Sequence, residues 1–154
     1  MEFSQQDIER INGNSLYKTV GILVDDAKDG KAHSRLRPNP ALCWPFEGQP
    51  HGGVLFTLMD TTMAWAVLTA TDQEYNCATI NLDIQYTRPA QGESFDCNAW
   101  LTHKGRQVVY SRAEIVDEKG RLVANGQGAF WIHKVAVKSS VKTLLLVSSD
   151  SDKE

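Results

Sequence analysis

Residues 48–65 read GQPHGGVLFTLMDTTMAW, and the apolar run that starts in this stretch continues to residue 70. Apart from one acid, Asp60, every residue from 54 to 70 is apolar or threonine. A run of this length and character predicts a helix that is buried on most sides. A carboxylate inside such a run loses hydration, which is costly unless the group is partnered or neutralised. Gly52 and Gly53 stand where a helix usually begins with Ser, Thr, Asp or Asn. Packing alone therefore explains neither the two glycines at the start of this helix nor the acid at its centre.

The sequence after the central helix predicts antiparallel strands. Residues 79–87, TINLDIQYT, alternate with a period of two, which predicts a strand with one buried face formed by Ile80, Leu82, Ile84 and Tyr86. Three further strands are predicted over 94–103, 106–116 and 121–132, and the short turns between them make a meander. A curved antiparallel sheet of this kind can wrap the apolar helix, so the fold class is α+β.

The sequence before the central helix is shorter and more polar. A helix is predicted over residues 4–12, capped by Ser4 and ended by Gly13. Strands are predicted over 19–24 and 31–36, with a turn over DDAKDG between them. Residues 37–50 carry four of the five prolines and therefore predict a loop.

Composition excludes several classes of protein. The 154 residues and the net charge of −3 fit one ordinary domain and do not suggest a nucleic-acid binder. The polar N-terminus does not resemble a signal peptide, and an apolar run interrupted by Asp60 is short and polar for a membrane span. Three cysteines at irregular spacing fit a reducing cytoplasm, and the four histidines form no ligand pair, so we expect no metal site.

The sequence resembles the hotdog-fold acyl-CoA thioesterases. The tripeptide His51-Gly52-Gly53, followed by Leu58-Met59-Asp60, is similar to the HGG…LxD signature of that family, and the PaaI-like and 4-hydroxybenzoyl-CoA thioesterase group is the most similar type. The stretches TINLDIQYTRPAQGESF and GRQVVYSRAEIVDEKGRLVANGQGAF resemble strands of the same family. The resemblance covers about residues 15–132 and implies a single hotdog domain over 15–134. The residues outside it are predicted to form an N-terminal helix and lead-in over 1–14 and a partly disordered tail over 135–154. The apolar segment 141–147 of this tail has no assigned role.

The resemblance assigns roles that thioester chemistry can explain. Backbone N–H groups at a helix start can hold an oxyanion, and glycines leave that backbone open to an acyl group. The resemblance implies that Gly52 donates its N–H to the oxyanion and that His51 orients the carbonyl. The resemblance also implies that Asp60 acts as general base or as nucleophile, and these alternatives stay open. Thr79 aligns with a hydroxyl residue that holds the attacking water in some members.

Substrate contacts are predicted on the same basis. Gly53 lies beside the carbonyl site, Arg88 and Arg106 are candidates for the CoA phosphates, and Trp65 is a candidate wall of the acyl pocket. No cofactor is expected, because CoA is part of the substrate. The identity of the acyl group does not follow from the sequence.

Spacing along the helix predicts an oligomer. Gly52 and Asp60 are eight residues apart, which is about 12 Å along one helix, too far for one thioester to touch both. Two antiparallel helices would bring Gly52 of one chain near Asp60 of another. The resemblance also implies active sites at a dimer interface, in a homodimer or a tetramer of two dimers.

One departure from the family keeps other functions open. Pro45 stands where related thioesterases commonly have an asparagine that helps to position the thioester or water. This favours, as the alternative, a non-catalytic module that binds acyl-CoA or an acyl carrier. A hotdog hydratase or dehydratase ranks third, because the D-x4-H pattern is absent and Trp65 stands in place of the histidine. The preferred reading is a cytoplasmic acyl-CoA thioesterase that needs no metal.

Overall fold

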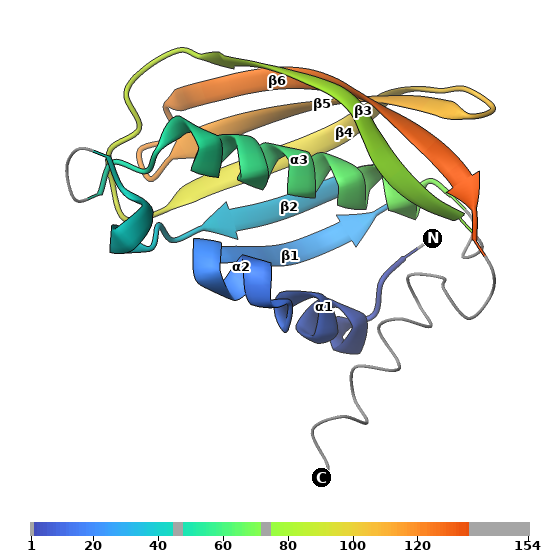
Figure 1. Ribbon diagram of the computed structural model, residues 1–154, viewed down its shortest axis with the longest axis horizontal. Helices are drawn as coiled ribbons and strands as arrows, with labels where there is room; N and C mark the ends of the chain where they lie inside the picture. The colour runs from blue at the N-terminus through green and yellow to red at the C-terminus, as the bar shows by residue number, and fades with distance from the viewer. Residues whose placement is uncertain (1, 45–47, 72–74, 136–154) are drawn as a thin grey trace, which may run out of the picture.

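An antiparallel sheet wraps around one long helix in the computed structural model of the chain (Figure 1). The structure describes residues 2–44, 48–71 and 75–135. The predicted tail with its segment 141–147, and Pro45, lie outside the described residues. The helices are α1 (Gln5–Asn12), α2 (Ser15–Val20) and α3 (Gly52–Thr69), with a short 3-10 turn at Pro40–Leu42. The strands are β1 (Ile22–Lys28), β2 (Lys31–Leu36), β3 (Tyr75–Tyr86), β4 (Phe95–Lys104), β5 (Val108–Asp117) and β6 (Leu122–Lys134).

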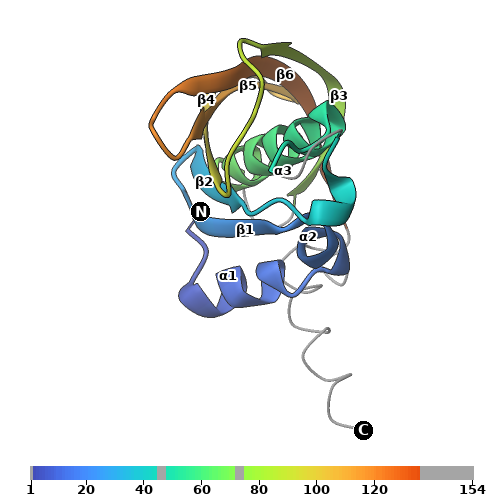
Figure 2. The same ribbon diagram turned by 90° about the vertical axis from the view of Figure 1, so that its left-hand side faces the viewer.

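The six strands follow the order β1-β2-β4-β5-β6-β3, and every neighbouring pair is antiparallel. The predicted meander is therefore confirmed as β4-β5-β6, and β3 returns to the far side of β6. Figure 2 shows the sheet curving around α3 when the molecule is viewed from one end. This arrangement confirms the predicted α+β fold with the helix inside the sheet.

The central helix is buried because its side chains face the concave side of the sheet. Leu58, Met59, Met63 and Ala66 have no exposed surface. Gly126 of β6 allows the closest approach, because a Cβ at this position would lie 2.5 Å from the Met59 sulfur. By length and composition α3 could also cross a membrane, but 67% of that stretch is buried inside the fold, as expected for a core helix.

The N-terminal part of the chain corrects two expectations. The predicted helix over 4–12 is confirmed, with a reciprocal cap between Ser4 and Asp7. The predicted strand over 19–24 is wrong in its first half, because α2 occupies Ser15–Val20 and ends at Gly21, whose φ is +91°. The predicted turn over 25–30 is wrong in its first four residues, because β1 runs through a register shift after Val24 and continues to Lys28. The turn itself is confined to Asp29 and Gly30. The structure thus replaces one predicted strand with a helix and a later, longer strand.

A β-bulge in β3 corrects the predicted burial of that strand. Thr79 pairs with Phe130 and Asn81 pairs with Ala129, so Ile80 is an extra residue with no partner of its own. A bulge shifts the alternation of side chains by one residue. Ile80 is therefore 56% exposed rather than buried, whereas Leu82 and Ile84 pack against the core as predicted.

The other end of the predicted apolar face also differs from the expectation. Tyr86 is 48% exposed, although it lies on the same side of β3 as Leu82 and Ile84. Strand β3 lies at the edge of the sheet, so one side of it has no neighbouring strand among the described residues. A side chain near the end of an edge strand stays partly open to solvent, and this places Tyr86 beside the start of α3.

Candidate active site

The carboxylate of Asp60 has a defined partner on β3. The hydroxyl of Thr79 donates a hydrogen bond of 2.8 Å to Oδ1 of Asp60. The bulge at Ile80 makes this contact possible, because it places Thr79 on the face of β3 that meets the helix. The structure therefore brings together two of the predicted catalytic residues. Among the residues that the structure describes, no donor reaches Oδ2 of Asp60.

The start of α3 is built by His51 and the two glycines. His51 is the N-cap residue, and its Nδ1 accepts a hydrogen bond of 3.0 Å from the N–H of Gly53. The carbonyl of His51 accepts from Val54 at 2.8 Å. Within the described part of the chain, the N–H of Gly52 donates to no atom. Gly52 therefore offers an open donor at the positive end of the helix, whereas the N–H of Gly53 is already occupied.

Tyr86 holds this helix start from the side and is a site residue that the sequence did not reveal. Its hydroxyl donates a hydrogen bond of 2.7 Å to the carbonyl of Gly52. A Cβ at position 52 would lie 3.3 Å from the Tyr86 ring, so the absence of a side chain at Gly52 lets the ring approach. Burial raises the pKa of Tyr86, so its hydroxyl stays protonated and keeps donating at neutral pH.

Two further titratable side chains, Tyr17 of α2 and Cys77 of β3, lie near Asp60. The indole N–H of Trp65 donates to the Tyr17 hydroxyl at 2.9 Å. Burial raises the pKa of Tyr17, and the charge of Asp60 raises it further. Burial likewise raises the pKa of the Cys77 thiol to about 12, with the charge of Asp60 as the second cause. Tyr17 and Cys77 are therefore both protonated at neutral pH, and neither offers a nucleophile.

Trp65 lies in the hydrophobic core. Its ring makes an edge contact with Phe3 at a centroid distance of 5.2 Å, and the residue is 9% exposed. The predicted contact of Trp65 with an acyl group stays a prediction. Sequence reasoning missed Tyr17 because residues 15–20 gave no sign of the short helix that carries it.

Comparison with known proteins assigns the family. The model of the Thioesterase superfamily matches residues 48–124 of this chain, which is half of its length and includes the start of α3, Asp60 and Thr79. The chain belongs to the thioesterase superfamily. It is also similar to a candidate esterase of Halobacterium salinarum, with 32% identity over 80% of this chain and 88% of the relative.

Solved structures agree on the fold of this thioesterase. A thioesterase of Haemophilus influenzae superposes with a TM-score of 0.79 and 17% identity, covering 86% of this chain and 92% of that one. The PaaI protein of the phenylacetic acid degradation operon of E. coli superposes with a TM-score of 0.71 and 22% identity, covering 86% and 96%. At these identities the two structures show the fold alone. They confirm the predicted hotdog fold. The match to the family model and the similarity to the Halobacterium salinarum relative identify the chain as a thioester hydrolase.

The thioesterase carries its two predicted phosphate ligands at opposite ends of β3. Arg88 is exposed and follows the end of β3 that lies beside Gly52. Arg106 is exposed in the β4–β5 turn and lines a 350 Å³ pocket with Tyr75, where β3 begins. One chain of the thioesterase therefore does not bring Arg88 and Arg106 together.

The described residues contain no group of three or more His, Cys, Asp or Glu side chains that could hold a metal ion. The expectation that this thioesterase works without a metal or cofactor stays a prediction. The effect of Pro45 also stays a prediction, because that residue is outside the described part of the chain.

Proposed function

We propose that this thioesterase hydrolyses an acyl-CoA to a carboxylic acid and free CoA, as a homodimer in the cytoplasm. The observation that carries the proposal is the hydrogen bond from Thr79 to Asp60, together with the open N–H of Gly52 at the start of the same helix. All three residues fall within the stretch that matches the family model. The cysteines Cys43, Cys77 and Cys97 are free, which fits a reducing compartment.

The chemistry needs a base or nucleophile and an oxyanion donor. In the first route Asp60 takes a proton from water while the water oxygen attacks the thioester carbonyl carbon. In the second route the carboxylate attacks that carbon itself, and water then hydrolyses the resulting anhydride. In both routes the carbonyl oxygen becomes an oxyanion that accepts from Gly52, and the C–S bond breaks to release the thiol of CoA after protonation. Thr79 fixes one oxygen of Asp60 and leaves the other for the reaction.

Two chains are needed to combine these groups on one substrate. Gly52 and Asp60 of one chain are separated by about 12 Å of helix. If β3 of one chain pairs antiparallel with β3 of a second copy, the Tyr86 end of one strand lies at the Tyr75 end of the other. Gly52 and Arg88 of one chain then share an end of the interface with Asp60 and Arg106 of the partner subunit. The same pairing therefore brings the predicted oxyanion donor close to the predicted base or nucleophile. It also brings the two predicted phosphate ligands to the same end of the interface.

The exposed edge of the sheet supports this pairing. An unpaired edge strand is a ready template for another strand, and β3 is twelve residues long. Ile80 on β3 and Phe56 on α3 are 56% and 36% exposed in the single chain. A second copy placed against β3 would give these apolar side chains a partner.

Release of free thiol from a panel of short, long and aromatic acyl-CoAs tests the proposal. We expect the wild type to hydrolyse at least one ester and Asp60→Asn to lose about a hundredfold or more in rate, because the amide cannot act as a base or nucleophile. Binding of a CoA ester should survive this substitution, since the size of the side chain is kept. If neither protein releases thiol but both bind the esters, the chain is a binding module instead.

A mixing experiment tests the shared active site. Gly52→Pro removes the N–H donor at the first position of the helix, where proline is tolerated. Each single variant should be inactive, whereas a mixture with Asp60→Asn should recover about a quarter of the activity, because half of the dimers are mixed and each has one intact site. Gly52→Ala keeps the N–H and is the matched control for the added bulk. Sites contained within single chains would give no recovery.

A further inference from the structure

A hollow lies at the end of the sheet where β6 ends, beside the turn between β4 and β5. We call it the terminal hollow. Its volume of 350 Å³ is at the lower end of the usual range for small-molecule pockets. Aromatic, cationic and amide side chains line it, among them Tyr75, Arg106, Gln107, Trp131, His133 and Lys134. No acid is among the described residues that line this hollow.

Trp131 gives the terminal hollow a flat aromatic surface. The residue is 46% exposed, and its ring is stacked on that of His133, with the centroids 4.6 Å apart and the ring planes at 24°. Its partners on the two neighbouring strands are Val108 and Ala78, and neither is large enough to cover an indole. A nucleobase stacks on an aromatic side chain of this kind, because every base presents a π-face.

His133 has an unmet hydrogen bond beside this surface. Its Nδ1 is shielded from solvent and has no hydrogen-bond partner among the described residues. Most buried polar atoms in folded proteins have a partner, so an exception calls for an explanation such as a ligand or a water. The unpaired Nδ1 is therefore an observation, independent of any charge, that points to a ligand at the stacked rings of Trp131 and His133.

The turn between β4 and β5 holds Arg106 beside the hollow. The turn closes through a 2.8 Å hydrogen bond from the N–H of Gly105 to the carbonyl of Val108. The carbonyl of Gln107 accepts a hydrogen bond of 2.8 Å from the N–H of Ile132, so the turn is attached to β6. Arg106 is exposed, and within the described residues it takes part in no ion pair.

Lys134 is the second cation that borders the terminal hollow. Its Nζ lies 5.8 Å from the centre of the Tyr75 ring. The hollow therefore combines a guanidinium and an ammonium group without a carboxylate among its described lining residues. These two groups are the side chains that proteins use most often to bind phosphate.

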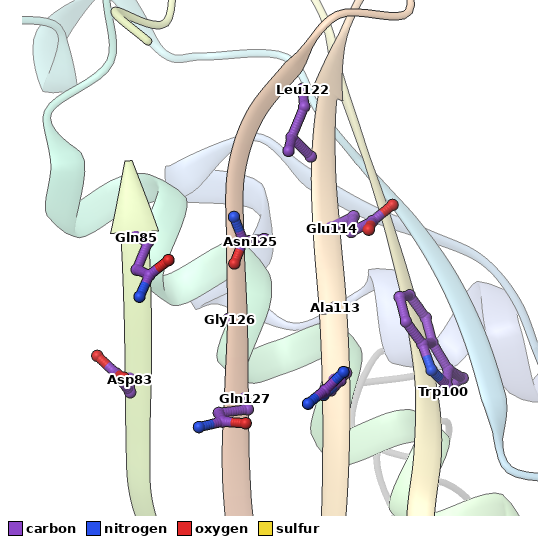
Figure 3. A pocket seen from close by; sticks show the side chains of 10 residues that line it. Asp83, Gln85, Trp100, Ala113, Glu114, Leu122, Asn125, Gly126 and Gln127 are labelled. Carbon is purple, nitrogen blue, oxygen red and sulfur yellow. The ribbon is translucent and has the colours of Figure 1, made fainter. Parts of the chain in front are cut away.

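The groove over the middle of the sheet differs from the terminal hollow in its charges (Figure 3). It carries the carboxylates of Asp83 and Glu114 beside the guanidinium of Arg112. An anion in this groove would meet two carboxylates for one cation, whereas an anion in the terminal hollow would meet two cations. The charges therefore favour the terminal hollow as the place for an anionic ligand.

We infer that the terminal hollow binds a nucleoside phosphate, with the base on Trp131 and the phosphate on Arg106 and Lys134. Stacking alone would accept any flat aromatic molecule, and the cations alone would accept any anion. The two features side by side favour a ligand that carries both a base and a phosphate. The nucleotide end of CoA and a free nucleotide share this chemistry.

The position of the hollow suits the nucleotide end of CoA. Tyr75 and Thr79 are four residues apart on β3, which is about 13 Å. Thr79 is the residue that contacts Asp60, and the pantetheine arm of CoA is long enough to span this distance. The identification of the nucleotide with that of CoA rests on the proposed function, whereas the binding of a nucleotide does not.

Calorimetric titration of the full chain with adenosine 3′,5′-bisphosphate tests the stacking surface. We expect the wild type to bind this probe and Trp131→Leu to raise Kd about tenfold or more, because the base loses its aromatic partner. Trp131→Phe keeps a ring and should stay within about threefold of the wild type. Tyr110→Leu is the matched control, because Tyr110 is an exposed aromatic residue of β5 that does not line the terminal hollow, and it should leave Kd unchanged.

The same titration tests the phosphate contact. Arg106→Gln should raise Kd about fivefold or more and should make Kd less dependent on salt, because one charge pair with the phosphate is lost. Arg112→Gln, in the groove over the middle of the sheet, should change neither property. Circular dichroism would verify that the variants fold, and Arg106→Gln tests the hollow on an exposed turn if Trp131→Leu folds poorly.

Thiol release distinguishes the two sources of the nucleotide. The same acyl group is supplied on CoA and on pantetheine, which has no nucleotide. If the hollow holds the nucleotide of CoA, Trp131→Leu should raise KM for the CoA ester about tenfold, with kcat unchanged, and should leave the pantetheine ester unaffected. If the hollow holds a free nucleotide, the probe should bind without competing with the CoA ester, and KM should stay the same.

Three results would overturn the inference: a wild type that does not bind the probe at millimolar concentration, an unchanged Kd in both Trp131→Leu and Arg106→Gln, or a loss in Tyr110→Leu as large as that in Trp131→Leu. A chain that binds the probe through Trp131 but hydrolyses neither ester would contradict the proposed function and support the nucleotide site. The two proposals can therefore fail separately.

Discussion

Thr79 donates a 2.8 Å hydrogen bond to Asp60 across the gap between a strand and the central helix. The contact involves one carboxylate oxygen, so it orients the group without consuming both of its acceptors. Asp60 lies in the middle of an apolar helix, where a carboxylate without partners would be costly. Asp60 is half-buried, so its remaining contact with solvent and the hydroxyl of Thr79 together explain why the acid is tolerated, and the hydroxyl gives it a fixed orientation.

Removing the hydroxyl of Thr79 should reduce the rate of thioester hydrolysis. Thr79→Val keeps the shape of the side chain but loses the donor. A hydrogen bond to a charged group contributes about 1.5–3 kcal/mol, so we expect kcat/KM to fall about tenfold or more. Thr79→Ser retains the donor and should stay within about threefold of the wild type. A loss in Thr79→Ser as large as that in Thr79→Val would show that the hydroxyl alone does not account for the effect.

The thiol of Cys77 should report on the charge of Asp60. Burial and the Asp60 carboxylate, in that order, raise the pKa of Cys77 to about 12. Asp60→Asn removes the second cause, so the pKa of Cys77 should fall while burial keeps it above the usual value. Alkylation of Cys77 at pH 9, followed by mass spectrometry to separate it from Cys43, should become about twofold to tenfold faster. An unchanged rate would mean that no negative charge stands beside the thiol in the wild type.

Gly126 should tolerate no side chain. A Cβ there would lie 2.5 Å from the Met59 sulfur and 2.6 Å from the backbone oxygen of Asp83, which cannot rotate away. We expect Gly126→Ala to lower the free energy of unfolding by about 3 kcal/mol, measured by chemical denaturation. Gly128→Ala meets its nearest atoms at 3.1 Å and 3.2 Å, so its effect should be smaller. The reverse order would show that the helix sits farther from β6 than the structure places it.

The turn between β5 and β6 should make stability depend on pH. Asp117 accepts hydrogen bonds from the Arg121 side chain at 2.7 Å and from two backbone N–H groups, which lowers the pKa of this carboxyl. Because the folded state favours the charged form, its stabilisation is present above about pH 4 and is lost as the pH falls through the lower folded value. Asp117→Asn should therefore reduce Tm at pH 7, and the gap to the wild type should narrow below pH 4. Asp26→Asn, on an exposed strand position, should change Tm little at either pH.

Much of the fold could be predicted because its strongest signals are long. The apolar run of α3 and the three strands of the meander each extend over ten residues or more, so periodicity defines them well. Helix α2 has only six residues, too few for a helical pattern of apolar residues to be recognised in the sequence. A helix this short is stabilised by its packing against the rest of the fold. Asp25 and Asp26 are typical of turns, yet strand β1 continues through them. The strand continues because the residue that follows them, Ala27, is buried in the core.

The site was only partly predictable for a related reason. Gly52 and Asp60 stand at fixed spacing in one helix, so their positions follow from the sequence. The contact of Thr79 with Asp60 depends on the bulge at Ile80. The sequence around Ile80 contains no glycine or proline that would have predicted this bulge. Tyr86 and Tyr17 reach the site from distant elements, and only the packing of strands and helices brings them there.

The extra residue at Ile80 divides β3 into two lengths that serve different purposes. The length before it carries Thr79 and Cys77 toward Asp60, and the length after it carries Leu82 and Ile84 into the core. In a strand without a bulge, side chains alternate between the two faces along its whole length. A shift of register in one half would therefore move the side chains of the other half to the opposite face. Here the bulge separates the two registers, so the side chains that face Asp60 can change without shifting the register of the length that carries Leu82 and Ile84.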